Sequence, residues 1–136
     1  MAKLCNEGET GTGNIVLNKA TQVDFYLGLY KDTDEPAETA TLATITEVTP
    51  ATFGYARIAL GSADWTEDGA IKGKFTNLEK TFTANGGTFG AVTGSFIATT
   101  ASGTAGKLWW VQHFTDGIHN IGDGSSQKVT PVVTAE

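Results

Sequence analysis

The segment that decides the fold reads GYARIAL at residues 54–60 and is followed by ADWT at residues 63–66. In residues 54–60, apolar side chains recur at every second position, which is typical of a β-strand with one buried face. Residues 63–66 then read as a turn that carries a large aromatic anchor, Trp65. Together the two segments predict a half-buried strand that ends at a turn, as in antiparallel β proteins.

The same alternation recurs along the rest of the chain, whereas helical spacing of apolar residues is nearly absent. A nearly continuous apolar run at residues 108–114 is typical of a central strand covered on both faces. Pro131 cannot donate a backbone hydrogen bond, so the last strand is expected at a sheet edge. The sequence therefore predicts an all-β, single-domain antiparallel β-sandwich or jelly-roll-like barrel of about eight strands. The other candidate strands lie at residues 23–30, 44–48, 71–75, 81–83, 92–98 and 129–133.

The chain divides into two parts by composition. Residues 21–136 carry the strand patterns and are expected to form the β-sandwich domain. Residues 1–20 are rich in glycine and polar side chains and are expected to form an extended N-terminal arm. Such an arm can pair its backbone with an edge strand of a neighbouring subunit.

Charge and composition exclude several classes of partner. The 136 residues carry a net charge of −6, and the nine Lys and Arg residues are scattered singly, so neither nucleic acid nor a membrane surface is an expected partner. Only 18% of the residues are charged, against about 25% in typical soluble domains, which suggests that partners cover part of the surface. Cys5 is the sole cysteine, so no intrachain disulfide forms. We expect no signal peptide, because no apolar run follows Met1.

No motif in the chain carries recognisable chemistry. Residues 8–13, GETGTG, resemble a phosphate loop but lack the strand, helix and Lys-Ser/Thr pair that such a loop needs. His113 and His119 are too few for a zinc site, and Asp116 and Asp123 lack the spacing of a calcium loop. We therefore expect a protein that is not an enzyme, with no catalytic residue, no cofactor and no metal.

Three tryptophans stand out as candidate contact residues. Adjacent residues on a strand point to opposite faces, so one of Trp109 and Trp110 is expected in the core and the other on the second face. That second face could be an interface between subunits, a doubly covered core, or a platform on which sugars stack. Trp65 could lie at an interface between subunits or belong to a platform on which sugars stack.

Arg57 lies beside Tyr55, and its guanidinium is expected to form a fork with a carboxylate such as Asp64 or Glu67. The apolar end of the N-terminal arm is a further candidate contact. The residues expected at an interface are Trp65, Trp109, Trp110, Tyr55, Arg57, Asn14, Ile15, Val16 and Leu17.

A series of short motifs runs from Val23 to Val133 and covers most of the chain. In this order the motifs resemble a family of small tailed-phage virion proteins, while the region before Thr21 departs from the pattern. The resemblance implies a virion structural, head-decoration or tail-fibre protein and carries no catalytic residues. The motifs are FYLGLY (25–30), ITEV (45–48), GYAR (54–57), DWT (64–66), a Gly-rich strand (90–99), GKLWW (106–110), HF (113–114), GD (122–123) and VTP (129–131).

These observations lead to one expected function and one alternative. The expected function is a capsid decoration (cement) protein, made in the host cytoplasm and located in the virion. It is expected to form a homotrimer and to bind the major capsid protein or another virion protein on the outer head surface through many weak contacts. The alternative is a tail-fibre or receptor-binding module that recognises a host surface glycan or protein.

Overall fold

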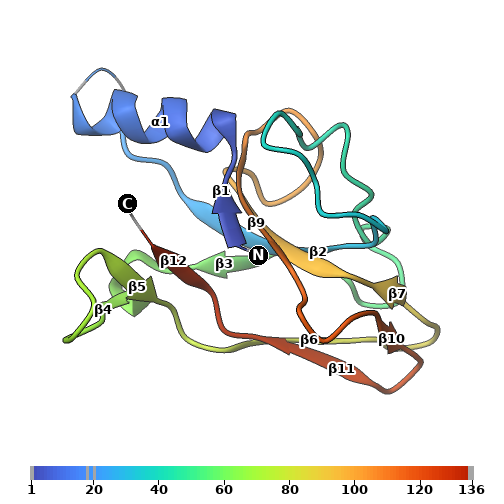
Figure 1. Cartoon of the computed structure of the whole chain (residues 1–136). Coiled ribbons are helices and arrows are strands. Elements are labelled where there is room, and N and C mark those ends of the chain that lie inside the picture. The colour runs from blue at the N-terminus through green and yellow to red at the C-terminus, as the bar shows by residue number, and fades with distance from the viewer. Residues whose placement is uncertain (1, 18, 20, 135–136) are drawn as a thin grey trace.

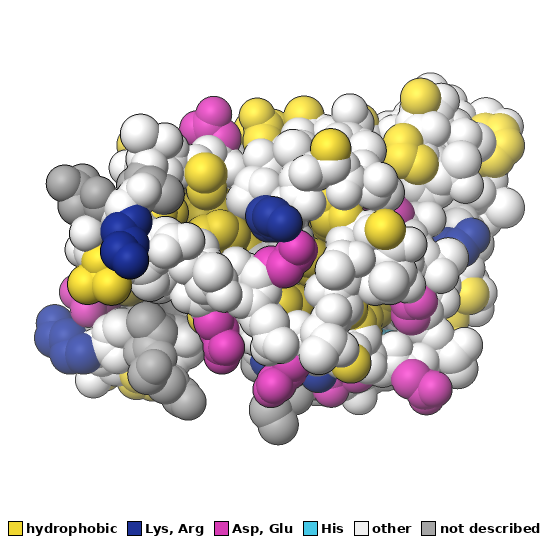
Figure 2. Space-filling model, turned by 90° about the horizontal axis from the view of Figure 1, so that it is seen from above, with side chains coloured by type: hydrophobic (Ala, Val, Ile, Leu, Met, Phe, Trp, Pro, Cys, Tyr) yellow, Lys and Arg dark blue, Asp and Glu magenta, His cyan; other side chains and the backbone are white. Residues whose placement is uncertain are grey.

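The computed structural model describes residues 2–17, 19 and 21–134. The expected all-β antiparallel sandwich is confirmed: the described residues form twelve strands and one α-helix, and every strand pair is antiparallel. Figure 1 shows one sheet with a long ribbon of paired strands beneath it, and with the helix and long loops above it. Figure 2 looks down on the upper side, where charged groups of both signs are interspersed with apolar and uncharged polar ones.

The upper layer is a five-stranded sheet in the order β1-β9-β8-β2-β3. The long apolar run becomes β9, which lies between two other strands and is covered on both faces, as predicted. β9 begins with Leu108, and its neighbour β8 is buried along its entire length. The strands are β1 (Ala2–Leu4), β2 (Phe25–Tyr30), β3 (Ile58–Leu60), β8 (Gly94–Ala98) and β9 (Leu108–His113).

The lower layer consists of three small sheets rather than one continuous sheet. Two successive strands near the middle of the chain run against two near its C-terminal end, the first of these middle strands also pairs with the short strand before it, and the third sheet joins β7 to β10. β12 lies at the edge of its sheet, as the nearby Pro131 predicted. The strands are β4 (Thr66–Glu67), β5 (Lys74–Thr76), β6 (Lys80–Thr83), β7 (Gly90–Val92), β10 (His119–Ile121), β11 (Ser126–Val129) and β12 (Val132–Thr134).

The two faces of the five-stranded sheet bury two separate apolar cores, because side chains alternate between the faces. The first core lies between the two layers and includes Leu27, Leu29 and Phe82. The second lies between the sheet and the segments above it, and includes Tyr30 and Phe96. Both faces of the sheet are therefore removed from water, but by different kinds of cover.

Three of the predicted strands are mostly irregular, and the one at residues 71–75 is regular only from Lys74 onward. Residues 44–48 form a turn in which only Glu47 makes a bridge, to Tyr30 of β2. In the segment 54–60, regular pairing begins only at Ile58. The first half of this segment is held by a side chain instead, because the Tyr55 hydroxyl accepts a hydrogen bond of 2.9 Å from the Leu29 amide.

The extended conformation expected for residues 1–20 is wrong. Residues Asn6–Val16 form the helix α1, and β1 pairs with β9 of the same chain. Glycine-rich sequence disfavours a helix in isolation, so tertiary contacts must stabilise this one. Gly8 is buried against β9, and the Glu7 carboxylate accepts hydrogen bonds from the Leu108 amide at 2.9 Å and the Lys107 ammonium at 3.1 Å. Residues 1, 18 and 20 of the predicted arm lie outside the described residues, as do residues 135 and 136 of the predicted domain.

Candidate functional site

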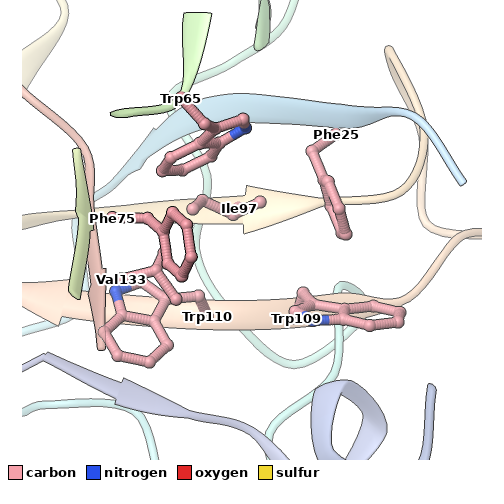
Figure 3. A pocket seen from close by; sticks show the side chains of 7 residues that line it. All are labelled: Phe25, Trp65, Phe75, Ile97, Trp109, Trp110 and Val133. Carbon is pink, nitrogen blue, oxygen red and sulfur yellow. The ribbon is translucent and has the colours of Figure 1, made fainter. Parts of the chain in front are cut away.

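An apolar pocket opens where the two layers of the sandwich part (Figure 3). The five-stranded sheet supplies one wall, and β5, β12 and the segment before β4 supply the other. The pocket has a volume of about 190 Å³. We call it the aromatic pocket; its lining residues are Phe25, Trp65, Phe75, Ile97, Trp109, Trp110 and Val133.

A β-bulge brings both adjacent tryptophans into this pocket. Ile97 of β8 pairs with Trp110, but the next residue, Ala98, pairs with Leu108, so Trp109 has no partner on β8. An extra residue of this kind interrupts the alternation of side chains. Trp109 and Trp110 therefore both line the pocket, while Leu108 lies in the second core. The prediction that the two tryptophans occupy opposite faces is wrong for this reason.

The tryptophans differ in their surroundings. Trp110 is almost fully buried in the core between the layers, whereas Trp109 and Trp65 are half-buried. The ring of Phe25 meets the ring of Trp109 edge to face, with centroids 5.1 Å apart. Phe75 is 38% exposed at the pocket. Phe25 is also half-buried, so every aromatic side chain of the pocket except Trp110 retains surface for a partner.

Trp109 also packs against α1. A Cβ atom added to Gly11 would lie 2.1 Å from the Trp109 ring, so the helix rests directly on the indole. Beside this contact is a second hollow of about 230 Å³, lined in part by Asn14, Ile15 and Val23. Trp109 lines both the hollow and the aromatic pocket, so it links the two surfaces.

The four residues predicted as contacts at the end of the arm divide into two pairs. Asn14 and Ile15 are half-buried and line the hollow under the helix. Val16 and Leu17 are 76% and 69% exposed at the end of α1. Of the four, only Val16 and Leu17 present largely exposed apolar side chains.

Tyr55 and Arg57 do not belong to an exposed surface, which corrects their selection as contact residues. Both are buried, and the carboxylate partner of Arg57 is Glu47 rather than Asp64 or Glu67. The guanidinium contacts this carboxylate with two nitrogens, at 2.9 and 2.8 Å. These residues therefore act inside the chain.

The Arg57 guanidinium also holds a loop above the sheet. It donates hydrogen bonds to the carbonyl oxygens of Thr100 and Gly103 at 2.9 and 2.8 Å, and it lies 5.2 Å from the centre of the Phe96 ring. The Tyr55 hydroxyl donates to Glu47 at 2.8 Å. Burial, and then the Glu47 carboxylate, raise the pKa of Tyr55, so the phenol remains protonated and can make this bond.

Sequence reasoning missed Phe25, Phe75, Ile97 and Val133 as pocket residues. Each was assigned to a strand, but the place where four strands bring them together depends on long-range pairing. No group of three or more His, Cys, Asp or Glu side chains suited to a metal ion occurs among the described residues. The described part of the chain also has no helix of the length and apolar character needed to cross a bilayer.

The fold and this site together define a β-sandwich with an aromatic-lined apolar surface pocket. A scan against models of known protein families gives no match, and a search of curated proteins gives none either.

Proposed function

We propose that this chain is a non-enzymatic virion structural protein, and specifically a capsid decoration protein of a tailed phage. The aromatic pocket is the observation that carries the proposal. Half-buried Trp65 and Trp109 and exposed Phe75 provide the large aromatic surface that dominates binding energy in protein interfaces. The partner is the major capsid protein or another virion protein, and the bound form is a homotrimer.

The size of the pocket favours weak individual contacts. A volume of about 190 Å³ suits one bulky apolar side chain of a partner rather than a long segment. A single anchor of this size binds weakly, but many copies on one particle gain strength through multivalency. The net charge of −6 is compatible with a position on the outer surface, away from packaged nucleic acid.

The alternative function is a tail-fibre or receptor-binding module. Aromatic rings that bind sugars act together with polar groups that hydrogen-bond the hydroxyls. The seven side chains of the aromatic pocket offer only indole N–H groups for this purpose, so the pocket suits an apolar protein side chain better than a glycan.

Particle binding tests the proposal. The purified protein is mixed with phage heads stripped of it, and bound protein is quantified after sedimentation. Trp65→Ala should lower the apparent affinity at least tenfold, because truncating an interface tryptophan typically costs about 2 kcal/mol or more. Leu78→Ser is the matched control, since Leu78 is 59% exposed and does not line the pocket. Binding by Trp65→Ala equal to that of the parent protein would contradict the proposal.

Copy number separates the two functions. Densitometry of purified virions should show an amount comparable to that of the major capsid protein if the chain decorates the head. An amount that is a small fraction of the capsid protein indicates a tail or fibre position.

A further inference from the structure

His119 has a hydrogen-bond acceptor at each of its two ring nitrogens. Its Nδ1 lies 2.6 Å from Oε1 of Gln127, and its Nε2 lies 2.8 Å from Oδ1 of Asp116. The orientation of the Gln127 amide is determined independently, because its Nε2 donates to the carbonyl oxygen of Lys128 at 2.9 Å. A neutral imidazole has one N–H group and can satisfy only one of these acceptors, so the full arrangement requires the doubly protonated ring.

The groups around this imidazole favour its charged form. Asp116 is the carboxylate in contact with the ring, and Phe114 stacks on it with centroids 4.7 Å apart. On β7, which pairs with β10, the residue opposite His119 is the uncharged Val92. On β11, the nearest charged side chain in sequence is Lys128, whose ammonium lies 4.0 Å from the Glu79 carboxylate.

We propose that Asp116, His119 and Gln127 form a proton-dependent clasp that ties the turn at residues 114–118 to strand β11. When His119 is protonated, it bridges Asp116 in the turn and Gln127 in the strand. When it loses a proton, one of these two acceptors loses its donor and the turn is released. The clasp acts on a surface distinct from the aromatic pocket and does not depend on the proposed function.

The expected direction of the pH effect follows from the contacts. The hydrogen bond to Gln127 raises the pKa of His119, burial opposes this shift, and the contact with Asp116 adds to it. A raised pKa in the folded state means that the clasp is fully formed below the ordinary imidazole pKa of about 6.5. It is lost as the pH rises through the higher value of the folded protein.

Two NMR measurements on the full-length protein test the clasp. The ¹⁵N shifts of the two imidazoles report which ring nitrogens carry protons. Hydrogen-exchange protection of the Phe114 amide, which donates to the Thr93 carbonyl oxygen at 2.8 Å where the turn begins, reports opening of the turn. Between about pH 5.5 and about pH 8.5, either side of the ordinary value, protection should fall about tenfold, the size expected for a lost charge-assisted hydrogen bond near the surface.

Matched variants separate the clasp from general effects of charge. Asp116→Asn should lower the pH at which protection is lost. Asp123→Asn is the control: it removes the same charge from a residue that does not contact the ring, so this pH should stay unchanged. Asp123 instead accepts a hydrogen bond from the Gly86 amide at 2.8 Å. His119→Gln should give low protection at both pH values. His113→Gln should behave like the parent protein, because the side-chain partner of His113 is the Tyr30 hydroxyl, at 3.2 Å.

Two results would overturn the clasp. The first is a His119 ring that carries a proton on only one nitrogen at about pH 5.5. The second is a pH-dependent loss of protection that persists in His119→Gln, since the titrating group would then lie elsewhere.

Discussion

The two sides of the five-stranded sheet are covered in different ways. Below it lie paired strands, whose backbone groups bond to one another, so this layer meets the sheet mainly through apolar side chains such as Phe82 and Phe89. Above it lie α1 and irregular loops, and the carbonyl groups of irregular loops need partners from elsewhere. The buried Arg57 donates hydrogen bonds to two of these carbonyl groups, those of Thr100 and Gly103.

Other polar side chains repeat this pattern on the upper side. The Asp32 carboxylate accepts hydrogen bonds from the amide and the hydroxyl of Thr46, at 2.8 and 3.1 Å. The Thr93 hydroxyl donates to the Asp32 carbonyl oxygen at 2.6 Å. Regular strands therefore cover a sheet mainly through apolar packing, whereas loops need specific polar contacts.

The largest expected effect is the loss of the polar contacts at Arg57. Arg57→Ala should lower the free energy of unfolding by about 3–5 kcal/mol, because it leaves the Glu47 carboxylate without its ion-pair partner in a largely buried position. Urea denaturation measures the change. Lys107→Ala breaks an exposed ion pair with Glu7 and serves as the control, with an expected change below about 1 kcal/mol. If Arg57→Ala lowers the free energy of unfolding by less than about 1 kcal/mol, polar contacts do not hold the loops above the sheet in place.

The next largest effect concerns the packing of α1 against β9. A Cβ atom at Gly8 would lie 2.3 Å from the carbonyl oxygen of Trp109, so Gly8→Ala should destabilise the protein by about 2 kcal/mol through overpacking. Gly13 has no neighbouring atom within 4 Å of such a Cβ, so Gly13→Ala should stabilise the helix by about 1 kcal/mol. A loss of stability in Gly8→Ala and a gain in Gly13→Ala, both measured by urea denaturation, would support close packing of the helix; the same sign for both would argue against it.

Cys5 provides a chemical readout of the same contact. Its side chain is fully buried in the upper core, and burial raises its pKa to about 11, so the thiol is neutral at lower pH. Iodoacetamide at about pH 8, below that value, should leave Cys5 unmodified in the parent protein and alkylate it faster in Gly8→Ala. Mass spectrometry follows the reaction, and rapid alkylation of the native parent protein would show that this side is open.

The smallest expected effect lies in the loop before Tyr55. Ala51 has a φ of 59°, in the left-handed region that disfavours side chains with a Cβ. Ala51→Gly should therefore stabilise the protein by about 1 kcal/mol. Ala91→Gly is the control. Ala91 lies in a strand, where glycine should lower the free energy of unfolding by about 0.5–1 kcal/mol. A loss of stability in both variants would show that Ala51 stores no strain.

The strands were more predictable than the site. Alternation of apolar residues at 23–30 and 92–98, and the continuous run at 108–114, located β2, β8 and β9. Side-chain alternation is a local property of an extended backbone, so it can be recognised without knowledge of the partner strands.

The aromatic pocket could be predicted only in part. Its tryptophans were recognised as candidate contacts, but the bulge that turns Trp109 and Trp110 to one side is produced by pairing with β8. The helix α1 was missed because its glycines carry low intrinsic helix propensity, and the lack of a side chain is an advantage only at Gly8 and Gly11, which pack against Trp109. The partner of Arg57 was missed because a loop brings Glu47 to it.

The sequence by itself determined the antiparallel β class and the acidic net charge, since strand periodicity and net charge depend only on the order and number of residues. Tertiary structure alone decided which aromatic side chains meet in one pocket, which loop carbonyls Arg57 satisfies, and which two acceptors flank His119. The physical reason is that these arrangements join residues far apart in the chain or on different elements, and their geometry exists only after the strands have paired.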